Sequence, residues 1–254
     1  MKTVIITGGT SGIGLNLANF FYNRNFNVAI AGLANKSTIN NLKKKFMINK
    51  SLILNLDLIK KTNIKKFVKL TNKKFKKVDV LINCAGLQHV APVCKFSDKL
   101  WDYIIAINLT TPFKMIKETL PIMRKNKWGR IINISSVHGS VASQFKSGYV
   151  SSKHGLVGLT KVIALETAKE NITCNAIGPG FVDTELVKKQ IKNISKKKGV
   201  GFNKISNNLL KEKHPSMNFI KKDDVSSLAY YLTTNHASQI TGSNLIIDGG
   251  WTAQ

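Results

Sequence analysis

Acidic residues, arginine and cysteine are scarce in this chain. Its 254 residues include 13 Asp and Glu against 39 Lys and Arg, of which only three are Arg, and the formal net charge is +26. No apolar run approaches the ~20 residues of a membrane-spanning helix, which excludes a spanning protein. The cysteines are odd in number and lack CxxC spacing, which excludes a disulfide framework and argues against a metal site: Cys84, Cys94 and Cys174.

The excess of positive charge raises the question of nucleic-acid binding. Arg rather than Lys does most of the bidentate reading of bases and phosphates, and the chain has little Arg. Abundant Lys, Asn and Ile together indicate a drift towards A/T-rich codons. We therefore expect no nucleic-acid partner, and a protein that binds anionic polymers is the alternative. The Lys-rich runs are expected to be solvated helix faces, at 43–45, 60–66, 73–77 and 196–198.

The start of the chain carries no secretory pattern. Met1 and Lys2 lead directly into the apolar run 3–7, without a long apolar stretch and a small-residue cleavage site. Together with the unpaired cysteines, this predicts a cytoplasmic protein with no membrane association.

Short runs rich in Val and Ile alternate with helical patterns along the chain. Apolar residues at nearly every position suit strands buried on both faces of a parallel sheet. The intervening helical segments of about 10–20 residues are those that βαβ units require. We predict one α/β domain over 1–254 with a doubly wound parallel (Rossmann-type) sheet of about seven strands, at 3–7, 27–31, 51–55, 79–83, 130–135, 173–177 and 244–248.

Residues 183–217 differ from the rest of the chain, because they combine many Lys and Asn with little strand pattern. The segment is too long for an ordinary loop. It follows a strand end, where ligands bind in such sheets, so the pattern predicts a helical lid before the last helix and strand. A disordered surface insertion is the alternative.

A glycine-rich turn joins the first strand to the first helix. Glycines there let backbone N–H groups approach a pyrophosphate, and the helix N-terminus adds a favourable dipole. The position of the turn makes this signal stronger than glycines alone. We expect the phosphates of a dinucleotide at Gly8, Thr10, Ser11, Gly12, Ile13 and Gly14.

Tyr149 and Lys153 stand four residues apart, on one face of a predicted helix. A phenol with a pKa of ~10 is a poor base at neutral pH. A neighbouring ammonium lowers that pKa, so Tyr149 could act as the base in alcohol oxidation and as the acid in ketone reduction. Ser136, thirteen residues earlier at a strand end, could orient the substrate oxygen.

These features together resemble the short-chain dehydrogenase/reductase family over residues 3–251. The glycine turn is similar to its TGxxxGxG loop, and residues 83–86 are similar to its NNAG motif, with Cys84 replacing the second Asn. The segment from Pro179 to Thr184 is similar to its PGxxxT nicotinamide segment. The resemblance implies a catalytic set in which one residue holds a water for proton relay to Lys153: Asn108, Ser136, Tyr149 and Lys153.

The same resemblance implies a nicotinamide cofactor. The residues at the end of the second predicted strand, 31–34, include neither the Asp or Glu that often binds the ribose of NAD nor an Arg that would suit NADP. Similar family members use NAD with neutral residues there, so we expect NAD; Lys36 could reach a 2′-phosphate, which keeps NADP open. The further cofactor-binding residues implied are Leu33, Asp57, Leu58, Asn83, Ala85, Gly86, Tyr149, Lys153, Pro179, Gly180, Val182 and Thr184.

Four segments around the site resemble the members of that family that oxidise (R)-3-hydroxybutyrate to acetoacetate. They are residues 87–93, 136–139, 146–149 and 186–191. The resemblance implies a small anionic 3-hydroxy acid as substrate, held at its carboxylate by Gln88, His138, Lys146 and Gln190. Ammonium, amide and imidazole donors suit such a carboxylate.

The remaining substrate residues implied are Tyr149, Phe181 and Trp251. Phe181 stands where those members have Trp, which leaves a roomier apolar pocket. The resemblance also implies a homotetramer, with helical segments 99–126 and 149–170 forming dimer contacts. An NADPH-dependent 3-oxoacyl thioester reductase is the nearest alternative activity.

Overall fold

The Val- and Ile-rich runs form the centre of the molecule. In the computed structural model, which describes residues 1–253, they pair as one parallel seven-stranded sheet in the order β3-β2-β1-β4-β5-β6-β7. The prediction of a doubly wound parallel sheet is therefore confirmed. The strands are β1 (Thr3–Thr7), β2 (Asn27–Gly32), β3 (Ser51–Asn55), β4 (Val80–Asn83), β5 (Gly129–Ile134), β6 (Ile172–Pro179) and β7 (Asn244–Ile247).

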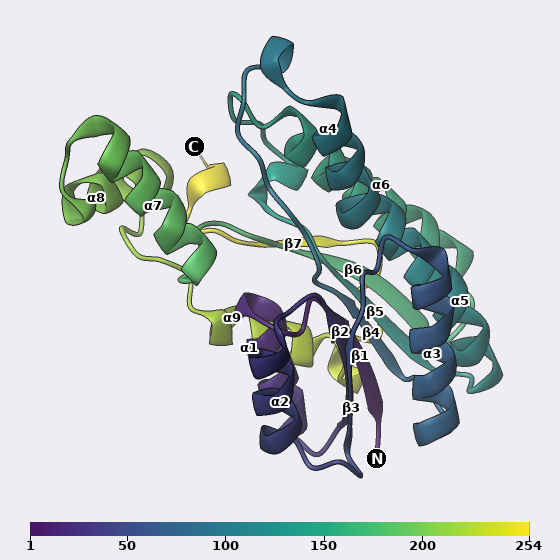
Figure 1. Ribbon diagram of the computed structural model, residues 1–254. Coiled ribbons are helices and arrows are strands. Elements are labelled where there is room, and N and C mark those ends of the chain that lie inside the picture. The colour runs from purple at the N-terminus through teal and green to yellow at the C-terminus, as the bar shows by residue number, and fades with distance from the viewer. Residues whose placement is uncertain (254) are drawn as a thin grey trace.

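Helices cover both faces of this sheet (Figure 1). Every residue of β1, β5 and β6 is buried, because apolar side chains point into a helical layer on either side. Two separate apolar clusters fill these layers. One face carries α1 (Gly12–Tyr22), α2 (Lys36–Lys45) and α9 (Lys222–Tyr231), and the other carries α3 (Lys61–Phe75), α5 (Thr111–Lys125) and α6 (Ser147–Glu166).

The helical segment predicted at 99–126 is not a single regular helix. It consists of α4 (Asp98–Ile105), a π-helical turn (Ala106–Thr110) and α5. The π-helical turn contains Asn108, which is completely buried. Such turns are frequent at functional sites, because the extra residue redirects a side chain. The second predicted segment, 149–170, is α6, which ends at Glu166.

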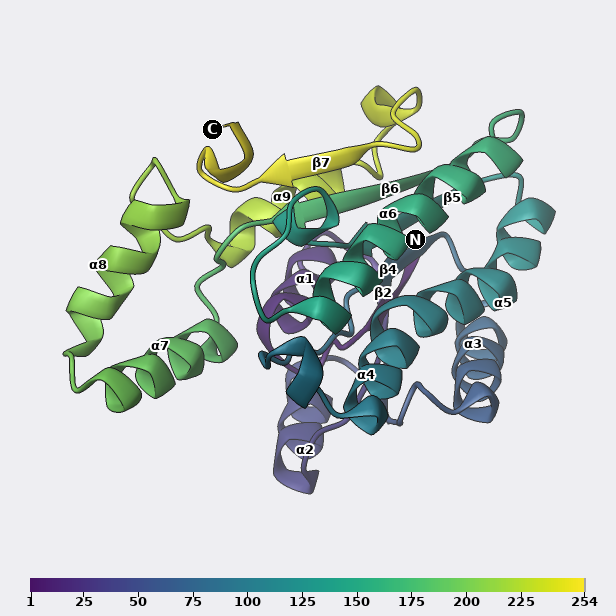
Figure 2. The same ribbon diagram turned by 90° about the horizontal axis from the view of Figure 1, so that it is seen from above.

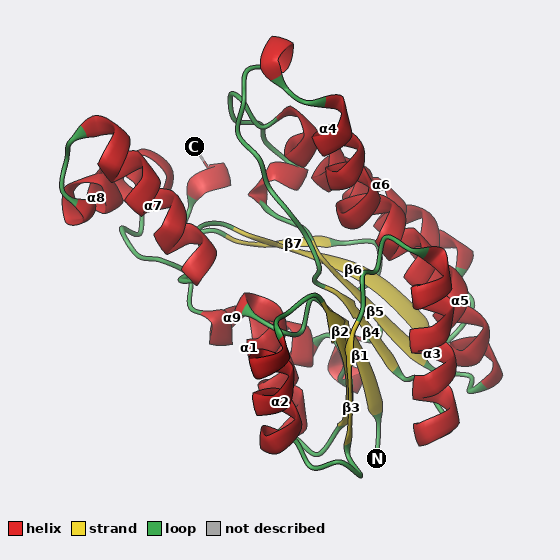
Figure 3. Ribbon diagram, viewed as in Figure 1, coloured by secondary structure: helices red, strands yellow, loops and turns green. Residues whose placement is uncertain are grey.

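The segment predicted as a lid contains α7 (Glu185–Lys198) and α8 (Phe202–Lys213). These two helices pack against each other and project beyond the end of the sheet, as the two views show (Figures 2 and 3). The hydroxyl of Thr184 accepts a hydrogen bond from the Val187 N–H and so caps α7. Nowhere in residues 1–253 is a helix long and apolar enough to cross a bilayer.

Candidate active site

The order of the strands determines where the site lies. Chain order reverses between β1 and β4, and ligands of open α/β sheets bind beyond the carboxyl ends of the strands at that point. A cavity of about 630 Å³ lies there. Its wall runs from the glycine-rich turn, past the ends of β4 and β5, to α7 and Trp251.

The glycine-rich turn provides a surface made of backbone. A Cβ on Gly8, whose φ is +69°, would lie 2.8 Å from the Cα of Ala85, and a Cβ on Gly14 would collide with the Gly8 carbonyl oxygen. The Thr7 hydroxyl accepts hydrogen bonds from the N–H groups of Cys84 (3.0 Å) and Ala85 (3.1 Å) and so joins the loops after β1 and β4. The first residues of α1, Gly12 to Gly14, line this surface. Because the first N–H groups of a helix have no partner within it, the surface fits the pyrophosphate of a dinucleotide.

The loop after β2 presents only neutral groups to the cavity. Leu33 lines it and is 62% exposed. The Asn55 amide holds the next residue in place, because it accepts from the Ala34 N–H (3.1 Å) and donates to the Ala34 carbonyl (2.9 Å). From this loop, the ribose at this end of a dinucleotide would therefore meet apolar and amide groups.

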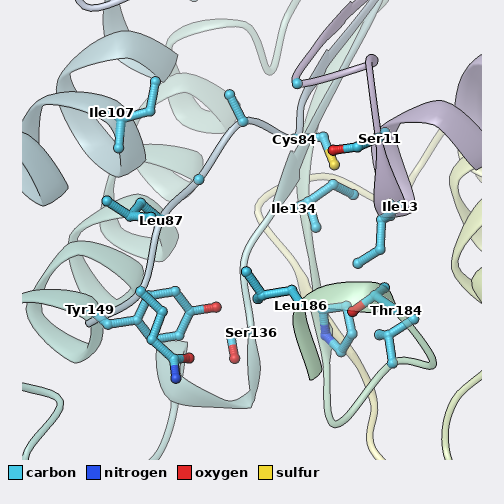
Figure 4. Close-up of a pocket in the computed structure, with 18 of the residues that line it drawn as sticks. Ser11, Ile13, Cys84, Leu87, Ile107, Ile134, Ser136, Tyr149, Thr184 and Leu186 are labelled. Atoms are coloured by element: carbon cyan, nitrogen blue, oxygen red, sulfur yellow. The ribbon is translucent and has the colours of Figure 1, made fainter. Parts of the chain in front are cut away.

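Tyr149 and Ser136 bring their hydroxyl groups together at the cavity wall (Figure 4). Burial raises the pKa of Tyr149, and the hydrogen bond with Ser136 lowers it in part. In the protein without cofactor, loss of hydration thus has a larger effect on this pKa than the Ser136 hydrogen bond. The lowering of the pKa expected from the Lys153 ammonium together with a bound cationic nicotinamide stays a prediction.

Lys153 lies beside Tyr149, one helical turn further along α6. Its ammonium is 5.6 Å from the centre of the Tyr149 ring and donates to the Ile134 carbonyl at 2.7 Å. Burial lowers the pKa of Lys153 to about 8. The ammonium is thus still mostly protonated near neutral pH, and the Ile134 carbonyl fixes its position.

Asn108 lies behind the cavity wall rather than in it. Its amide accepts from the Leu87 N–H (2.8 Å) and donates to the Leu87 carbonyl (2.9 Å) and to the Ser152 hydroxyl (3.0 Å). A Cβ on Gly86 would lie 3.2 Å from its amide oxygen. Asn108 therefore fixes the chain at Leu87 beside Lys153, while the water that the resemblance implies stays a prediction.

His138 and Lys146 form the polar part of the substrate end. The His138 Nδ1 is 3.3 Å from the Ser136 hydroxyl, and its Nε2 is 2.9 Å from that of Ser143. Burial, together with the charges of Lys146 and Lys213, lowers the pKa of His138 to about 3, so the imidazole is neutral at physiological pH. Burial also lowers the pKa of Lys146.

Trp251 closes this end of the cavity. Its ring centre is 5.4 Å from that of His138 and 5.1 Å from that of Phe181. The Asp248 carboxylate accepts from the Gly250 N–H (3.0 Å) and from the Thr252 N–H and hydroxyl (2.7 Å each), which fixes the terminal turn that carries the indole.

Most of the predicted site residues line one cavity. Asn83 and Asn108 are not part of its wall, and Asn83 instead donates to the Asn133 amide oxygen (2.8 Å) between β4 and β5. No cluster of metal-ligating side chains occurs among residues 1–253. The residues at the wall are Gly8, Thr10, Ser11, Gly12, Ile13, Gly14, Leu33, Asp57, Leu58, Ala85, Gly86, Gln88, Ser136, His138, Lys146, Tyr149, Lys153, Pro179, Gly180, Phe181, Val182, Thr184, Gln190 and Trp251.

His214 is a site residue that the sequence did not reveal. Its Nε2 accepts from the Phe181 N–H (2.9 Å), its Nδ1 donates to the Asn218 carbonyl (3.0 Å), and its ring stacks on that of Phe181 at 5.4 Å. These bonds require the neutral imidazole, and burial lowers its pKa. A lone histidine at the end of a Lys-rich segment carries no sequence signal for this role.

The fold and the cavity together define an oxidoreductase of the class that uses a nicotinamide cofactor. The sequence profile of the family described as short chain dehydrogenase matches residues 2–195. The chain belongs to this family, as its motifs predict.

Individual relatives resemble the whole chain. A D-beta-hydroxybutyrate dehydrogenase of Rhizobium meliloti (strain 1021) is 41% identical, covering 100% of this chain and 99% of the relative. Among solved structures, a 4-hydroxyisoleucine dehydrogenase complexed with NADH is 32% identical with a TM-score of 0.82, covering 100% of both chains. An actinorhodin polyketide ketoreductase with NADPH is 26% identical with a TM-score of 0.93, covering 100% of this chain and 98% of the other.

Proposed function

We propose that the protein oxidises (R)-3-hydroxybutyrate reversibly to acetoacetate, with NAD as the cofactor. The observation that carries this proposal is Lys146, which is 8% exposed and lies in the same cavity as Tyr149 and Ser136. Within residues 1–253, no carboxylate lies at ion-pair distance from its ammonium. A small acid whose carboxylate binds Lys146 would offset that buried charge.

The proton transfer falls to Tyr149. When bound, the cofactor supplies the acceptor for the hydride that leaves the carbinol carbon. Tyr149 as phenolate takes the hydroxyl proton, and Ser136 donates a hydrogen bond to the substrate oxygen. The Lys153 ammonium, 5.6 Å from the phenol ring, favours the phenolate against the effect of burial. In the reverse direction, the Tyr149 hydroxyl returns the proton to the carbonyl oxygen.

The surrounding side chains orient the acid. Lys146, the neutral imidazole of His138 and the amides of Gln88 and Gln190 are polar groups of the cavity wall that suit a carboxylate. The rings of Phe181 and Trp251, 5.1 Å apart, offer an apolar surface to the methyl group. The 41% identity to a D-beta-hydroxybutyrate dehydrogenase supports the same substrate.

The neutral groups at the end of β2 support NAD over NADP. Leu33 lies where a 2′-phosphate would otherwise find cationic partners, and the Asn55 bonds hold this loop in place.

We further propose that residues 183–217 are a substrate lid. Leu186 lines the cavity while 61% exposed, which leaves apolar surface for a bound ligand to cover.

An assay of the purified protein tests the activity. NADH should form from (R)-3-hydroxybutyrate, with the (S) enantiomer and NADP as poorer reactants. Absence of NADH from the (R) form would overturn the proposal. Reduction of an acetoacetyl thioester by NADPH, measured beside reduction of acetoacetate by NADH, distinguishes the alternative reductase, which should prefer the thioester.

We also propose a homotetramer. Phe113 on α5 and Val162 and Leu165 on α6 are 47%, 51% and 79% exposed, which is apolar surface that a second copy could cover. Light scattering on the purified protein should give a mass four times that of one chain, and a monomer would contradict the proposal.

A further inference from the structure

Lys213 brings a second ammonium near the substrate end of the cavity, behind Trp251, although it is not itself part of the cavity wall. It is the last residue of α8, and its Nζ is 5.8 Å from the centre of the Trp251 ring. The same indole lies 5.4 Å from the His138 ring, measured between ring centres. The charge of Lys213 lowers the pKa of both His138 and Lys146, although burial is the larger cause in each case. Lys213 and Lys146 thus reach one region from different segments.

Among residues 1–253, the only carboxylate paired with either ammonium belongs to Glu212, and it is a weak partner. Glu212 lies 2.9 Å from Lys213, but its side chain is 63% exposed, whereas that of Lys213 is 32% exposed. Surface pairs of this kind contribute little free energy, because water solvates both charges in the unpaired state. Within residues 1–253, Lys146 therefore has no carboxylate at ion-pair distance and Lys213 has only this weak partner, so an anion between them would be attracted to both lysines.

The backbone beside Lys213 is held at the cavity. The neighbouring His214 accepts a hydrogen bond from the Phe181 N–H and stacks on the Phe181 ring. Other lid lysines differ: Lys188, for example, pairs with Asp183 at 2.9 Å, and Lys211 is exposed to solvent. Lys213 thus combines a fixed backbone position with an ammonium that a ligand can recruit.

We propose that Lys213 is a specificity-determining residue that supplies a second positive charge to the substrate carboxylate from the lid. This inference rests on the proposed function, since it assigns the carboxylate of the 3-hydroxy acid to the region between Lys146 and Lys213. Binding of the acid then draws the Lys213 ammonium, rather than the backbone of α8, towards the cavity, and the lid selects anionic over neutral alcohols.

Kinetics of Lys213→Gln test the inference on two substrates. For (R)-3-hydroxybutyrate, KM should rise about tenfold while kcat stays within about twofold, since the change removes one partly solvated charge interaction. For the uncharged methyl ester of the same acid, KM should not rise. Lys211→Gln, on the same helix, is the matched control and should leave both KM values unchanged.

Two kinetic outcomes overturn the inference: an unchanged KM for the acid, or an equal rise in KM for the acid and the ester, which would indicate a structural role. If the wild type does not turn over the acid, the proposed function fails separately. Titration with the unreactive anion butyrate, monitored by tryptophan fluorescence, measures the affinity of the anion site without turnover. The inference expects butyrate to bind Lys213→Gln about tenfold more weakly than wild type, and equal affinity would overturn it.

Discussion

The phosphate end of the cavity is built from backbone, whereas its substrate end is built from side chains of separate segments. At the phosphate end, Gly8 and Gly14 leave no room for a Cβ beside neighbouring backbone atoms. At the substrate end, Phe181 after β6, His214 after α8 and Trp251 near the chain end contact one another through their rings. We therefore expect changes at the phosphate end to impair cofactor binding, and changes at the substrate end to alter KM and selectivity.

The largest effect is expected where the two ends meet. Tyr149→Phe removes the transferable proton and should lower kcat about a thousandfold with little change in cofactor affinity. Since burial raises the pKa of Tyr149, wild-type oxidation should accelerate as pH rises and ketone reduction should slow. Steady-state rates across pH check both statements. Retention of more than a tenth of the wild-type rate by Tyr149→Phe would show that another group moves the proton.

Gly14→Ala tests the backbone construction of the phosphate end. The added methyl collides with the Gly8 carbonyl, so the turn must move, and the affinity for NADH should fall about tenfold with a loss of about 1–3 kcal/mol in unfolding free energy. NADH fluorescence measures the affinity, and urea denaturation measures the free energy of unfolding. The matched control is Gly158→Ala in α6, where a Cβ meets nothing within 4 Å. The higher helix propensity of Ala should raise the free energy of unfolding of this variant by about 0.5–1 kcal/mol. Unaltered NADH affinity in Gly14→Ala would contradict the comparison.

His214 tests the side-chain construction of the substrate end. His214→Leu removes the acceptor for the Phe181 N–H, so KM should rise about tenfold and stability should fall by about 1–3 kcal/mol. His214→Gln restores an acceptor and should retain most of the wild-type affinity. If the leucine and glutamine variants behave alike, the hydrogen bond is not what holds Phe181.

The same histidine should give the wild type an acid sensitivity. Burial lowers its pKa, so the neutral imidazole persists at neutral pH and is lost only as pH falls below the ordinary value of ~6.5. Protonated Nε2 cannot accept from Phe181. KM should therefore rise on acidification in the wild type and stay flatter in His214→Gln, as initial rates at several pH values would show.

Glu212→Gln should produce the smallest effect, a fall in KM rather than the rise expected for the His214 and Lys213 variants. The change frees the Lys213 ammonium from its 2.9 Å partner, so KM for the acid should fall about twofold, within the range of a surface ion pair. The kinetics of the methyl ester provide the comparison, because a neutral substrate should not respond. A rise in KM for the acid would show that Glu212 orients Lys213 rather than competes for it.

The strands were predictable because burial on both faces requires an unbroken apolar run. The predicted bounds of the first and third strands agree with β1 and β3, and the others differ by a few residues at their ends. The π-helical turn at Asn108 was not predictable from a continuous helical pattern, because one inserted residue leaves the local sequence preference unchanged. Asn83 shows a similar limit: its motif indicated the cofactor, while its side chain bridges β4 and β5.

The sequence by itself determined the order of the strands along the chain, the glycine turn and the spacing of Ser136, Tyr149 and Lys153, because each depends on local periodicity or on a motif. The tertiary structure alone decided how Lys213, at the end of α8, comes to lie over Trp251, 38 residues further along the chain. It also decided the pKa directions, since a raised value for Tyr149 follows from the hydration lost on burial rather than from the residues next to it in sequence.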